Sequence, residues 1–470
     1  MIDDMFVLLK QELLVTVIIF ILLLIKVSSA VWGNEFTLKL VNGLLLVNFI
    51  AGLFISGGGV LFGGMFHTDM LIILEKNMLN LGTLIVSLQA YSWLKHHRHV
   101  LEFYILLLST LLGLFFMISA GNLLLFYLGL ELSSIPLAAL SNFDLEKRRS
   151  SEAAMKFILS AAFSSGLLLF GISLVYGTTG SLAFVEITRH LDGSPLQLFA
   201  FILLLSGFAF KISVVPFHLW TADVYEGSPV PVTAWFSVIS KGAVFFVFVP
   251  VLYTVFRPMV TDWSRILYLL AILTMLVGNL FAIRQNNLKR LLAFSSIAQV
   301  GFILVGITGS SRAGSASVVY FVLIYIFSNL GAFGVVTFIS ALTGKEEISD
   351  YKGLYATNPL LCWVMAISLF SLAGIPPTAG FFGKFFLLLA GAGGGHYWLV
   401  VIAALNMIIS LYYYLRVIRA MFMEGSERPI EKLPVSILPA IAMICCVCGV
   451  ILTGLAGWVY DYIYSLSREF

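Results

Sequence analysis

Long runs of apolar residues, separated by short polar stretches, follow one another along the whole chain. Each run is continuous over about 20 residues, which is the length that an α-helix needs to cross the hydrocarbon core of a bilayer. A membrane-spanning β-strand would instead alternate apolar and polar positions over about 10 residues. Because only helices and closed barrels satisfy every backbone polar group in lipid, the pattern predicts a bundle of membrane-spanning helices.

The runs predict about fourteen spans, and the polar stretches between them are too short to hold a soluble domain. We therefore expect an all-α, polytopic membrane protein with one membrane domain over residues 1–470. The expected spans are 13–30, 38–61, 74–94, 100–120, 123–142, 153–176, 196–220, 230–256, 267–283, 291–307, 318–342, 359–390, 398–421 and 435–459.

The composition supports a membrane protein. Of the 470 residues, 60% are hydrophobic and 11% are charged, and the mean hydropathy is +1.02. A soluble protein of this size needs more polar surface, so soluble classes are excluded. The first span ends in KVSSA, which resembles a signal-peptide cleavage site, but the acidic residues Asp3, Asp4 and Glu12 precede it. Because a signal peptide begins with positive charge, we expect this helix to be retained.

Lysine and arginine are concentrated in the loops that follow odd-numbered spans. These loops contain 95–99, 146–149, 284–290, Lys345 with Lys352, and Arg428 with Lys432, whereas the other loops hold only Arg189, Arg257, Arg265 and Arg312. The positive-inside rule places the basic loops in the cytoplasm and both termini in the periplasm. The net charge of +3 follows from this bias, so we expect no nucleic-acid partner.

Cysteines and glycine clusters give no sign of a cofactor in this chain. Cys362 stands alone, and Cys445, Cys446 and Cys448 lie in the last apolar run without a nearby histidine, so we interpret them as small buried side chains. The glycine clusters at 57–59 and 391–395 lack the lysine of a phosphate-binding loop. We interpret these clusters as helix ends or tight connections.

Charged residues well inside the predicted spans are few: Lys156, Lys211, Lys241, Lys384 and Glu131. A charge at the bilayer centre costs about 2.5 to 3.5 kcal/mol on insertion scales, so such residues usually pair, face internal water and mark ion pathways. Structural alternatives remain for three of them. Lys156 is near enough to the cytoplasmic end to extend to the interface, Glu131 could only neutralise a lysine, and Lys384 could only supply charge to a neighbouring helix.

The stretch VVPFHLW interrupts the seventh span shortly after Lys211. Pro216 lacks an amide hydrogen and clashes with the preceding turn, so we expect the helix to break about one turn beyond Lys211. Backbone groups freed inside a membrane need protein or water around them, so the break and His218 indicate an internal hydrated cavity. The alternative is a passive kink with a core histidine.

The twelfth span has the same arrangement, with Pro376 and Pro377 ahead of Lys384. Two interrupted spans five apart run in opposite directions, which is the arrangement of an inverted repeat. We therefore expect N-terminal helices one to three (1–99), a first repeat of helices four to eight (100–256), a second repeat of helices nine to thirteen (264–421) and a C-terminal helix fourteen (433–470).

Four strings together identify a family resemblance: FYLGLELSSIPLAAL, FKISVVPFHLWTADVYEGSPVPV, NLKRLLAFSSIAQVGFILVG and FSLAGIPPTAGFFGKF. They resemble the antiporter-like membrane subunits of respiratory complex I, the proton-translocating NADH:quinone oxidoreductase of the respiratory chain. The resemblance implies fourteen helices in two inverted five-helix repeats with broken helices seven and twelve. It favours the type termed N, because type M has a glutamate at the helix-twelve position and type L continues into a long lateral helix.

By this resemblance, Glu131 and Lys211 match the family's helix-five glutamate and helix-seven lysine, and Lys241 matches its central helix-eight lysine. Lys384 and Lys156 match lysines of helices twelve and six. His218, beside the break, is a further candidate in the proton route. Two departures are Ala222, where relatives commonly have proline, and Gln299, where many have histidine. Because Gln299 cannot titrate, a relay there needs water, Lys384 or polar side chains.

The resemblance also implies the setting. It places the chain in a bacterial inner membrane, among lipid and the other membrane and peripheral subunits of complex I. Quinone, FMN and iron–sulfur clusters are expected in those partner subunits and not in this chain. Two alternatives remain: a subunit of a multisubunit cation/proton antiporter of the same fold, and a structural membrane scaffold whose lysines only hold partner helices.

Overall fold

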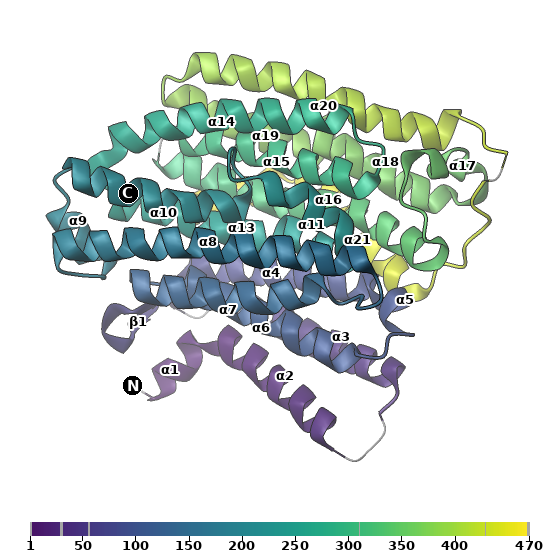
Figure 1. Cartoon of the computed structure of the whole chain (residues 1–470), viewed down its shortest axis with the longest axis horizontal. Helices are drawn as coiled ribbons and strands as arrows, with labels where there is room; N and C mark the ends of the chain where they lie inside the picture. Colours follow the sequence, from purple (N-terminus) through teal and green to yellow (C-terminus); the bar gives the residue numbers. More distant parts are fainter. Residues whose placement is uncertain (1, 29–31, 55–56, 310, 428, 468–470) are drawn as a thin grey trace.

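The computed structural model describes residues 2–28, 32–54, 57–309, 311–427 and 429–467. Ala30, Arg428 and Phe470, on which some sequence predictions rest, lie outside these ranges. The helices lie side by side in a bundle, with the N-terminal helices at one edge and the C-terminal half at the opposite edge (Figure 1). The expected all-α, polytopic fold is confirmed.

The elements are α1 Ile2–Leu8, α2 Lys10–Val27, α3 Asn34–Leu53, β1 Gly59–Leu61, β2 Phe66–Thr68, α4 Met70–Gln89, α5 Tyr91–Leu94, α6 Val100–Ile118, α7 Leu123–Ser141, α8 Arg148–Thr179, α9 Phe184–His190, α10 Pro195–Ile212, α11 Leu219–Gly227, α12 Val230–Trp235, α13 Lys241–Pro250, α14 Val260–Ile283, α15 Leu288–Ile307, α16 Ser311–Thr343, α17 Leu354–Thr357, α18 Pro359–Ala373, α19 Ala379–Gly393, α20 Tyr397–Met423, α21 Ile437–Leu455 and α22 Gly457–Leu466. Short 3-10 or π segments join several of them.

Twelve helices in the described part of the chain are long and apolar enough to cross a membrane. The remaining two expected spans correspond to α2, which carries three charged residues, and to the pair α18 and α19, which are the halves of an interrupted helix. The antiparallel hairpin of β1 and β2 was not predicted, because three-residue strands give too short a pattern to recognise.

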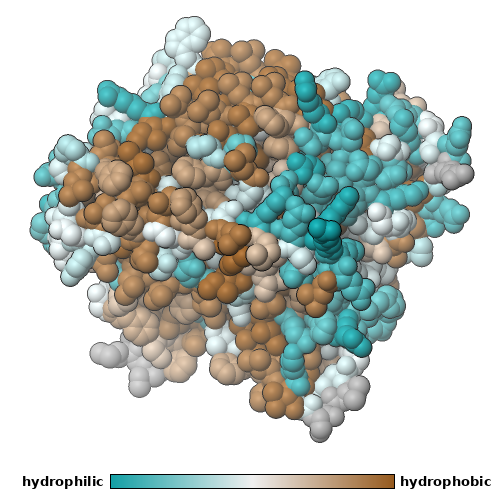
Figure 2. Space-filling model, viewed as in Figure 1, coloured by the Kyte–Doolittle hydropathy of each residue, from teal (hydrophilic) through white to brown (hydrophobic). Residues whose placement is uncertain are grey.

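The core of the bundle lies along three spans: 230–255, 288–307 and 312–343. In these spans 89% to 94% of the residues in the most apolar window are buried within the protein. Helices α8 and α21 have only 33% of theirs buried and so present apolar side chains outward. Figure 2 shows a largely apolar surface on the face turned to the viewer, with the polar residues gathered on the side where α5 and α17 lie. That side carries the basic loops predicted to be cytoplasmic.

The interrupted seventh helix breaks earlier than expected. α10 ends at Ile212, one residue after Lys211, and Ser213 takes the left-handed conformation with φ 66°. The freed backbone groups find side-chain partners, since Trp220 Nε1 donates to Phe210 O at 3.1 Å and Val215 N donates to Thr274 Oγ1 at 3.1 Å. The chain therefore leaves the helix without leaving these groups unsatisfied in the membrane.

The twelfth helix breaks between α18 and α19. α18 ends at Ala373, Gly374 follows with φ 86°, and α19 begins at Ala379 beyond the two prolines. A residue with positive φ after the last helical turn is the usual way to end an α-helix, and glycine takes it at no steric cost. Both predicted interruptions are therefore present.

The cysteine prediction is only partly right. Cys362 and Cys446 are buried and Cys445 is half-buried, but Cys448 is exposed on the surface of α21. A single helix carries consecutive residues to different faces, so three cysteines within four positions of one helix cannot all point inward.

Candidate functional site

Three buried lysines lie where the regular helical backbone is interrupted. Lys211 is the penultimate residue of α10, Lys384 is one and a half turns beyond the start of α19, and Lys241 directly follows a π-helical turn over Phe236–Ser240. Their relative exposures are 9%, 1% and 2% respectively. A buried amine needs a polar partner, so the contacts of each lysine define what it can do.

Lys211 and Glu131 each have a serine as hydrogen-bond partner. Lys211 Nζ donates a hydrogen bond to Ser134 Oγ on α7, three residues after Glu131 and on the same face of that helix. The Glu131 carboxylate accepts a hydrogen bond from Ser165 Oγ on α8, and it also acts electrostatically on Lys211. No direct ion pair joins Lys211 to a carboxylate among the described residues. The two charges therefore interact at a distance, and a different serine holds each of them.

Lys241 joins the two halves of the molecule. Its Nζ donates to Ser296 Oγ on α15 at 2.8 Å and lies 5.4 Å from the centre of the Tyr225 ring on α11. An aromatic face stabilises a cation by attraction to the ring electrons. Lys241 thus has neutral partners on both sides and contacts the interrupted seventh helix through Tyr225.

Lys384 is held by the end of a helix. Its Nζ donates to Leu372 O at 2.7 Å and to Ala373 O at 3.3 Å, the last carbonyl groups of α18, and lies 4.6 Å from the centre of the Phe302 ring. The last carbonyls of a helix carry a partial negative charge, so they suit a cation. The interruption of the twelfth helix supplies these carbonyls.

A row of hydrogen bonds leads from the neighbourhood of Lys241 to Lys384. Ser295, next to Ser296 in the chain, bonds to the Tyr414 hydroxyl. Gln299 Nε2 bonds both to Tyr414 OH at 3.2 Å and to Leu372 O at 3.0 Å. Gln299 Oε1 is buried and has no hydrogen-bond partner among the described residues. Sequence reasoning missed Tyr414, because a tyrosine among the aromatic residues of an apolar span gives no distinguishing signal.

His218 lies at the N-terminus of α11, half-buried, beside the break. No hydrogen bond joins it to a lysine in the part of the chain that the structure describes. The structure thus brings His218 to the expected interruption but not into contact with the three buried lysines.

Lys156 lies apart from the buried row. Its Nζ makes ion pairs with Asp223 Oδ2 at 2.6 Å and Glu152 Oε1 at 2.8 Å, and 43% of its side chain is exposed. Arg290 NH1 pairs with Asp223 at 2.8 Å and with Glu226 at 2.7 Å. Burial alone would raise the pKa of Asp223, but hydrogen bonds from Lys156 and Arg290 hold it below its ordinary value of 3.8. This position matches the alternative in which Lys156 extends to the interface.

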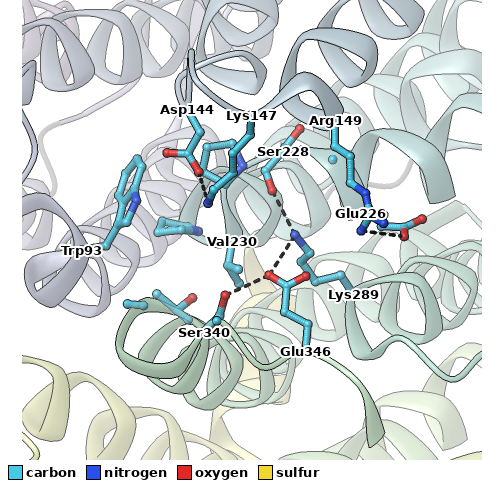
Figure 3. Close-up of a pocket in the computed structure, with 16 residues that line it drawn as sticks. Trp93, Asp144, Lys147, Arg149, Glu226, Ser228, Val230, Lys289, Ser340 and Glu346 are labelled. Carbon is cyan, nitrogen blue, oxygen red and sulfur yellow. Dashed lines mark hydrogen bonds and ion pairs between the residues drawn. The ribbon is translucent and has the colours of Figure 1, made fainter. Parts of the chain in front are cut away.

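A pocket of about 320 Å³ lies beside this cluster, on the side of the basic loops (Figure 3). Figure 3 shows Lys289 and Glu346 pointing toward each other across it, with a nitrogen–oxygen distance of 3.2 Å. Lys289 Nζ also donates to Ser228 O at 3.3 Å, and Ser340 Oγ donates to Glu346 at 2.8 Å. The sequence assigned Lys289 to a loop, whereas α15 already begins at Leu288.

Sequence reasoning did not single out a further buried ion pair in the N-terminal helices. Lys76 on α4 and Glu12 on α2 form this pair with side chains only 1% and 3% exposed, and Glu75 is buried beside them. Both members lie near the start of their helices, Lys76 in the second turn of α4 and Glu12 in the first turn of α2, and not well inside a span.

Comparison with known proteins places this geometry in a family. The family model described as "NADH:quinone oxidoreductase/Mrp antiporter, TM" matches residues 120–410. "NADH-quinone oxidoreductase subunit N" from Phocaeicola vulgatus is 50% identical over 405 residues, which cover 85% of this chain and 86% of the relative. The protein of the same name from Azobacteroides pseudotrichonymphae is 44% identical over 414 residues, covering 87% and 86%.

Two solved structures share the fold. A chain of "Respiratory complex I from Thermus thermophilus with bound Aureothin" matches with a TM-score of 0.83 and 30% identity, covering 96% of this chain and 98% of that chain. A chain of "Structure of Mrp complex from Dietzia sp. DQ12-45-1b" matches with a TM-score of 0.87 and 21% identity, covering 97% and 96%. At that lower identity the second likeness concerns the fold alone.

Proposed function

The chain belongs to the NADH:quinone oxidoreductase/Mrp antiporter membrane-subunit family, and on this premise we propose how its buried residues carry protons. It is a proton-translocating, antiporter-like subunit of NADH:quinone oxidoreductase and works together with other subunits of complex I. The observation that connects this function to residues is the row of buried lysines at helix interruptions, joined by hydroxyl, amide and carbonyl groups.

The proposed first step is a change in the interaction between Glu131 and Lys211. Burial away from water disfavours the charged form of an amine, whereas a nearby carboxylate favours it. A change in their separation therefore alters whether Lys211 keeps its proton or passes it to Lys241. Lys211 is held by Ser134 and Glu131 by Ser165, so a change in either hydrogen bond alters this separation.

The second half of the route runs from Lys241 to Lys384. We assign Ser296, Ser295, Tyr414 and Gln299 to this part, with water completing the steps that direct hydrogen bonds do not cover. Hydroxyl groups and water both donate and accept hydrogen bonds, so they pass a proton without holding a charge. Many relatives have histidine at the position of Gln299. A titratable group is not required at this position, because hydroxyl groups and water pass the proton.

Lys384 exchanges protons with the far end of the route. We assign His218 and Lys156 to the path by which protons reach the buried lysines near the break of the seventh helix. The energy comes from quinone reduction in partner subunits that carry the quinone site, the FMN and the iron–sulfur clusters. Moving one charge against 100 mV takes about 2.3 kcal/mol, which is within reach of a rearranged buried ion pair. We further propose two inverted repeats over 100–256 and 264–421, a bacterial inner membrane, and termini in the periplasm.

Purification of the complex through an affinity tag on this chain tests the function. Reconstituted in lipid vesicles, the complex should oxidise NADH with quinone and acidify one compartment, as recorded by a pH-sensitive dye. Cation/proton exchange driven by an imposed sodium gradient, without quinone reduction in the purified material, would instead identify a subunit of a cation/proton antiporter.

A further inference from the structure

The N-terminal helices contain a second set of buried polar residues, outside the residues 120–410 that the family model covers. At its centre is the ion pair between Lys76 Nζ on α4 and Glu12 Oε1 on α2, with the Phe66 ring of the hairpin 5.0 Å from the lysine. One oxygen of the carboxylate, Glu12 Oε2, is buried and has no hydrogen-bond partner among the described residues. The pair is therefore only half satisfied by protein.

The polar residues continue along one face of α4. Lys76, Asn80, Thr83 and Ser87 are spaced by four, three and four positions, so they form a single row about 16 Å long on the helix surface. All four are buried, with exposures of 1% or less. A row of this kind in the middle of a membrane protein costs free energy unless each group has a partner.

The middle of this row lacks protein partners. Both side-chain polar atoms of Asn80 and both of Asn48 on α3 are buried without a hydrogen bond among the described residues. Asn48 lies one turn before Gly52, and a methyl group at Gly52 would overlap the side chains of Asn77 and Gln11. This contact shows that the same face of α3 is turned toward α4 and α2. The unpartnered amides therefore point into the interface that contains the ion pair.

The far end of the row is closed by direct contacts between side chains. Ser87 Oγ bonds to Asn42 Oδ1 at 2.7 Å and to Tyr104 OH at 2.8 Å. Thr83 Oγ1 accepts from Trp235 Nε1 on α12 at 3.3 Å. The polar row is thus unsatisfied near Glu12 and Asn80, and satisfied by protein where it approaches the side of the basic loops.

We propose that α2, α3 and α4 enclose a water-filled half-channel that opens at the side where α4 begins and binds a proton at Glu12. Buried polar groups without protein partners are normally satisfied by ordered water, and a row of amides and hydroxyls provides the two to four partners that each water needs. A proton arriving along this water adds to Glu12 Oε2, while Oε1 keeps its contact with Lys76. At Ser87 the row ends in direct contacts between protein side chains.

Several other groups set the charge around this site. Protonation of Glu12 depends on Lys76 and Glu75 of α4, and on the groups at the same end of these helices: Lys10 of α2, Asp69 at the N-terminus of α4 and His67 of β2. A positive amine in the site disfavours a metal cation, whereas neutral water can bond to the unpartnered amides and to Glu12 Oε2. The site differs from the Glu131–Lys211 pair in position and in having a direct ion pair.

Infrared difference spectra of the intact complex in lipid nanodiscs, recorded between alkaline and acidic pH, test the proton site. Glu12→Gln should remove a band of a buried carboxylic acid that the unmodified complex shows, and Glu35→Gln should not. Glu35 is the matched control, because it pairs with Lys95 at 2.6 Å on the exposed end of α3. The double variant Glu12→Gln/Lys76→Met removes both members of the ion pair and must lose the same band. Retention of the full set of bands in both variants would overturn the proposal.

Hydrogen–deuterium exchange tests the water. The α4 amides from Asn77 to Ser87 should exchange faster than those of α6, and Asn80→Leu should slow them by filling the row with an apolar side chain. Thr110→Val is the control, since this buried hydroxyl on α6 is satisfied by Leu107 O of its own helix at 2.6 Å. Equal protection of α4 and α6 in the unmodified complex would show a dry interface and refute the half-channel.

Discussion

Gln299 and Lys384 donate hydrogen bonds to the same carbonyl oxygen, that of Leu372, at 3.0 and 2.7 Å. A carbonyl oxygen has two lone pairs and accepts both bonds at once. This shared acceptor connects the polar row of α15 to the lysine of α19 across the interruption of the twelfth helix. It also makes the position of Lys384 depend on where α18 ends.

Lys384→Arg should impair proton pumping even though the positive charge is kept, because a guanidinium group does not give up its proton in proteins. Lys384→Met should impair pumping as well, and both complexes should assemble. Lys432→Arg, on an exposed stretch of chain, is the control. Pumping and assembly measured side by side decide the role, since wild-type pumping in the arginine variant would remove Lys384 from the proton route.

Lys211→Ala should give an assembled complex with greatly reduced quinone-coupled pumping, and Glu131→Ala should act similarly by removing the paired charge. Ser134→Ala should cause a smaller loss, because it removes only the hydroxyl that accepts a hydrogen bond from Lys211. Ser141→Ala is the matched control on the same helix, where the hydroxyl bonds to Ala138 O at 2.7 Å. Normal pumping by a fully assembled Lys211→Ala complex would contradict the mechanism.

Tyr414→Phe should slow pumping, because it removes the hydroxyl that connects Ser295 to Gln299. One lost hydrogen bond is worth about 0.5–1.5 kcal/mol, so the fold and assembly should survive. The control is Tyr412→Phe, two positions earlier on α20, where the side chain is 60% exposed. Equal pumping rates in the two variants would remove Tyr414 from the relay.

Asp223→Asn should lower the thermal midpoint of the complex at neutral pH by weakening the ion pairs to Lys156 and Arg290, a loss of about 1 kcal/mol or less for partly exposed pairs. The pKa of Asp223 is lowered in the folded chain, so its stabilisation is fully present above pH 3.8 and is lost as the pH falls through the lower folded value. Midpoints recorded against pH should therefore converge on acidification. A constant difference at every pH would show that ionisation of Asp223 is not the cause.

A reporter enzyme that is active only in the periplasm should be silent when fused near Arg148 and active when fused after Phe470. The distribution of lysine and arginine motivates this expectation. A second fusion in the hairpin, near Val60, should be active, because it lies at the end of the bundle opposite the basic loops. The reverse pattern would invalidate the assigned orientation.

The fold was predictable because its signals are long and repeated. Runs of about 20 apolar residues give the spans, and proline near a lysine inside an apolar run gives both interruptions. The hairpin was missed because three-residue strands carry no pattern. Lys76 was missed because it lies near the polar start of its span, where a lysine does not stand out, and only the packing of α4 against α2 shows that it is buried.

Residues of the site were predictable when they were exceptional in type. A lysine within an apolar span stands out, so Lys211, Lys241 and Lys384 were found and are buried. Lys156 was equally prominent, but 43% of its side chain is exposed and it pairs with Glu152 of its own helix α8 and with Asp223 of α11, whose position follows from the break. Tyr414 and the carbonyl of Leu372 were not predictable, since their roles depend on which helices meet in space.

The negative charge that faces Lys384 comes from main-chain carbonyls, whereas the one that acts on Lys211 comes from the side chain of Glu131. A single codon change deletes a glutamate, but no ordinary substitution deletes a backbone carbonyl. The counter-charge of Lys384 is therefore protected against mutation and does not itself take up a proton at any physiological pH. Substitutions can therefore weaken this half of the route only by replacing the lysine or by moving the end of the helix. The glycine and prolines of the interruption are then as important for function as the lysine itself.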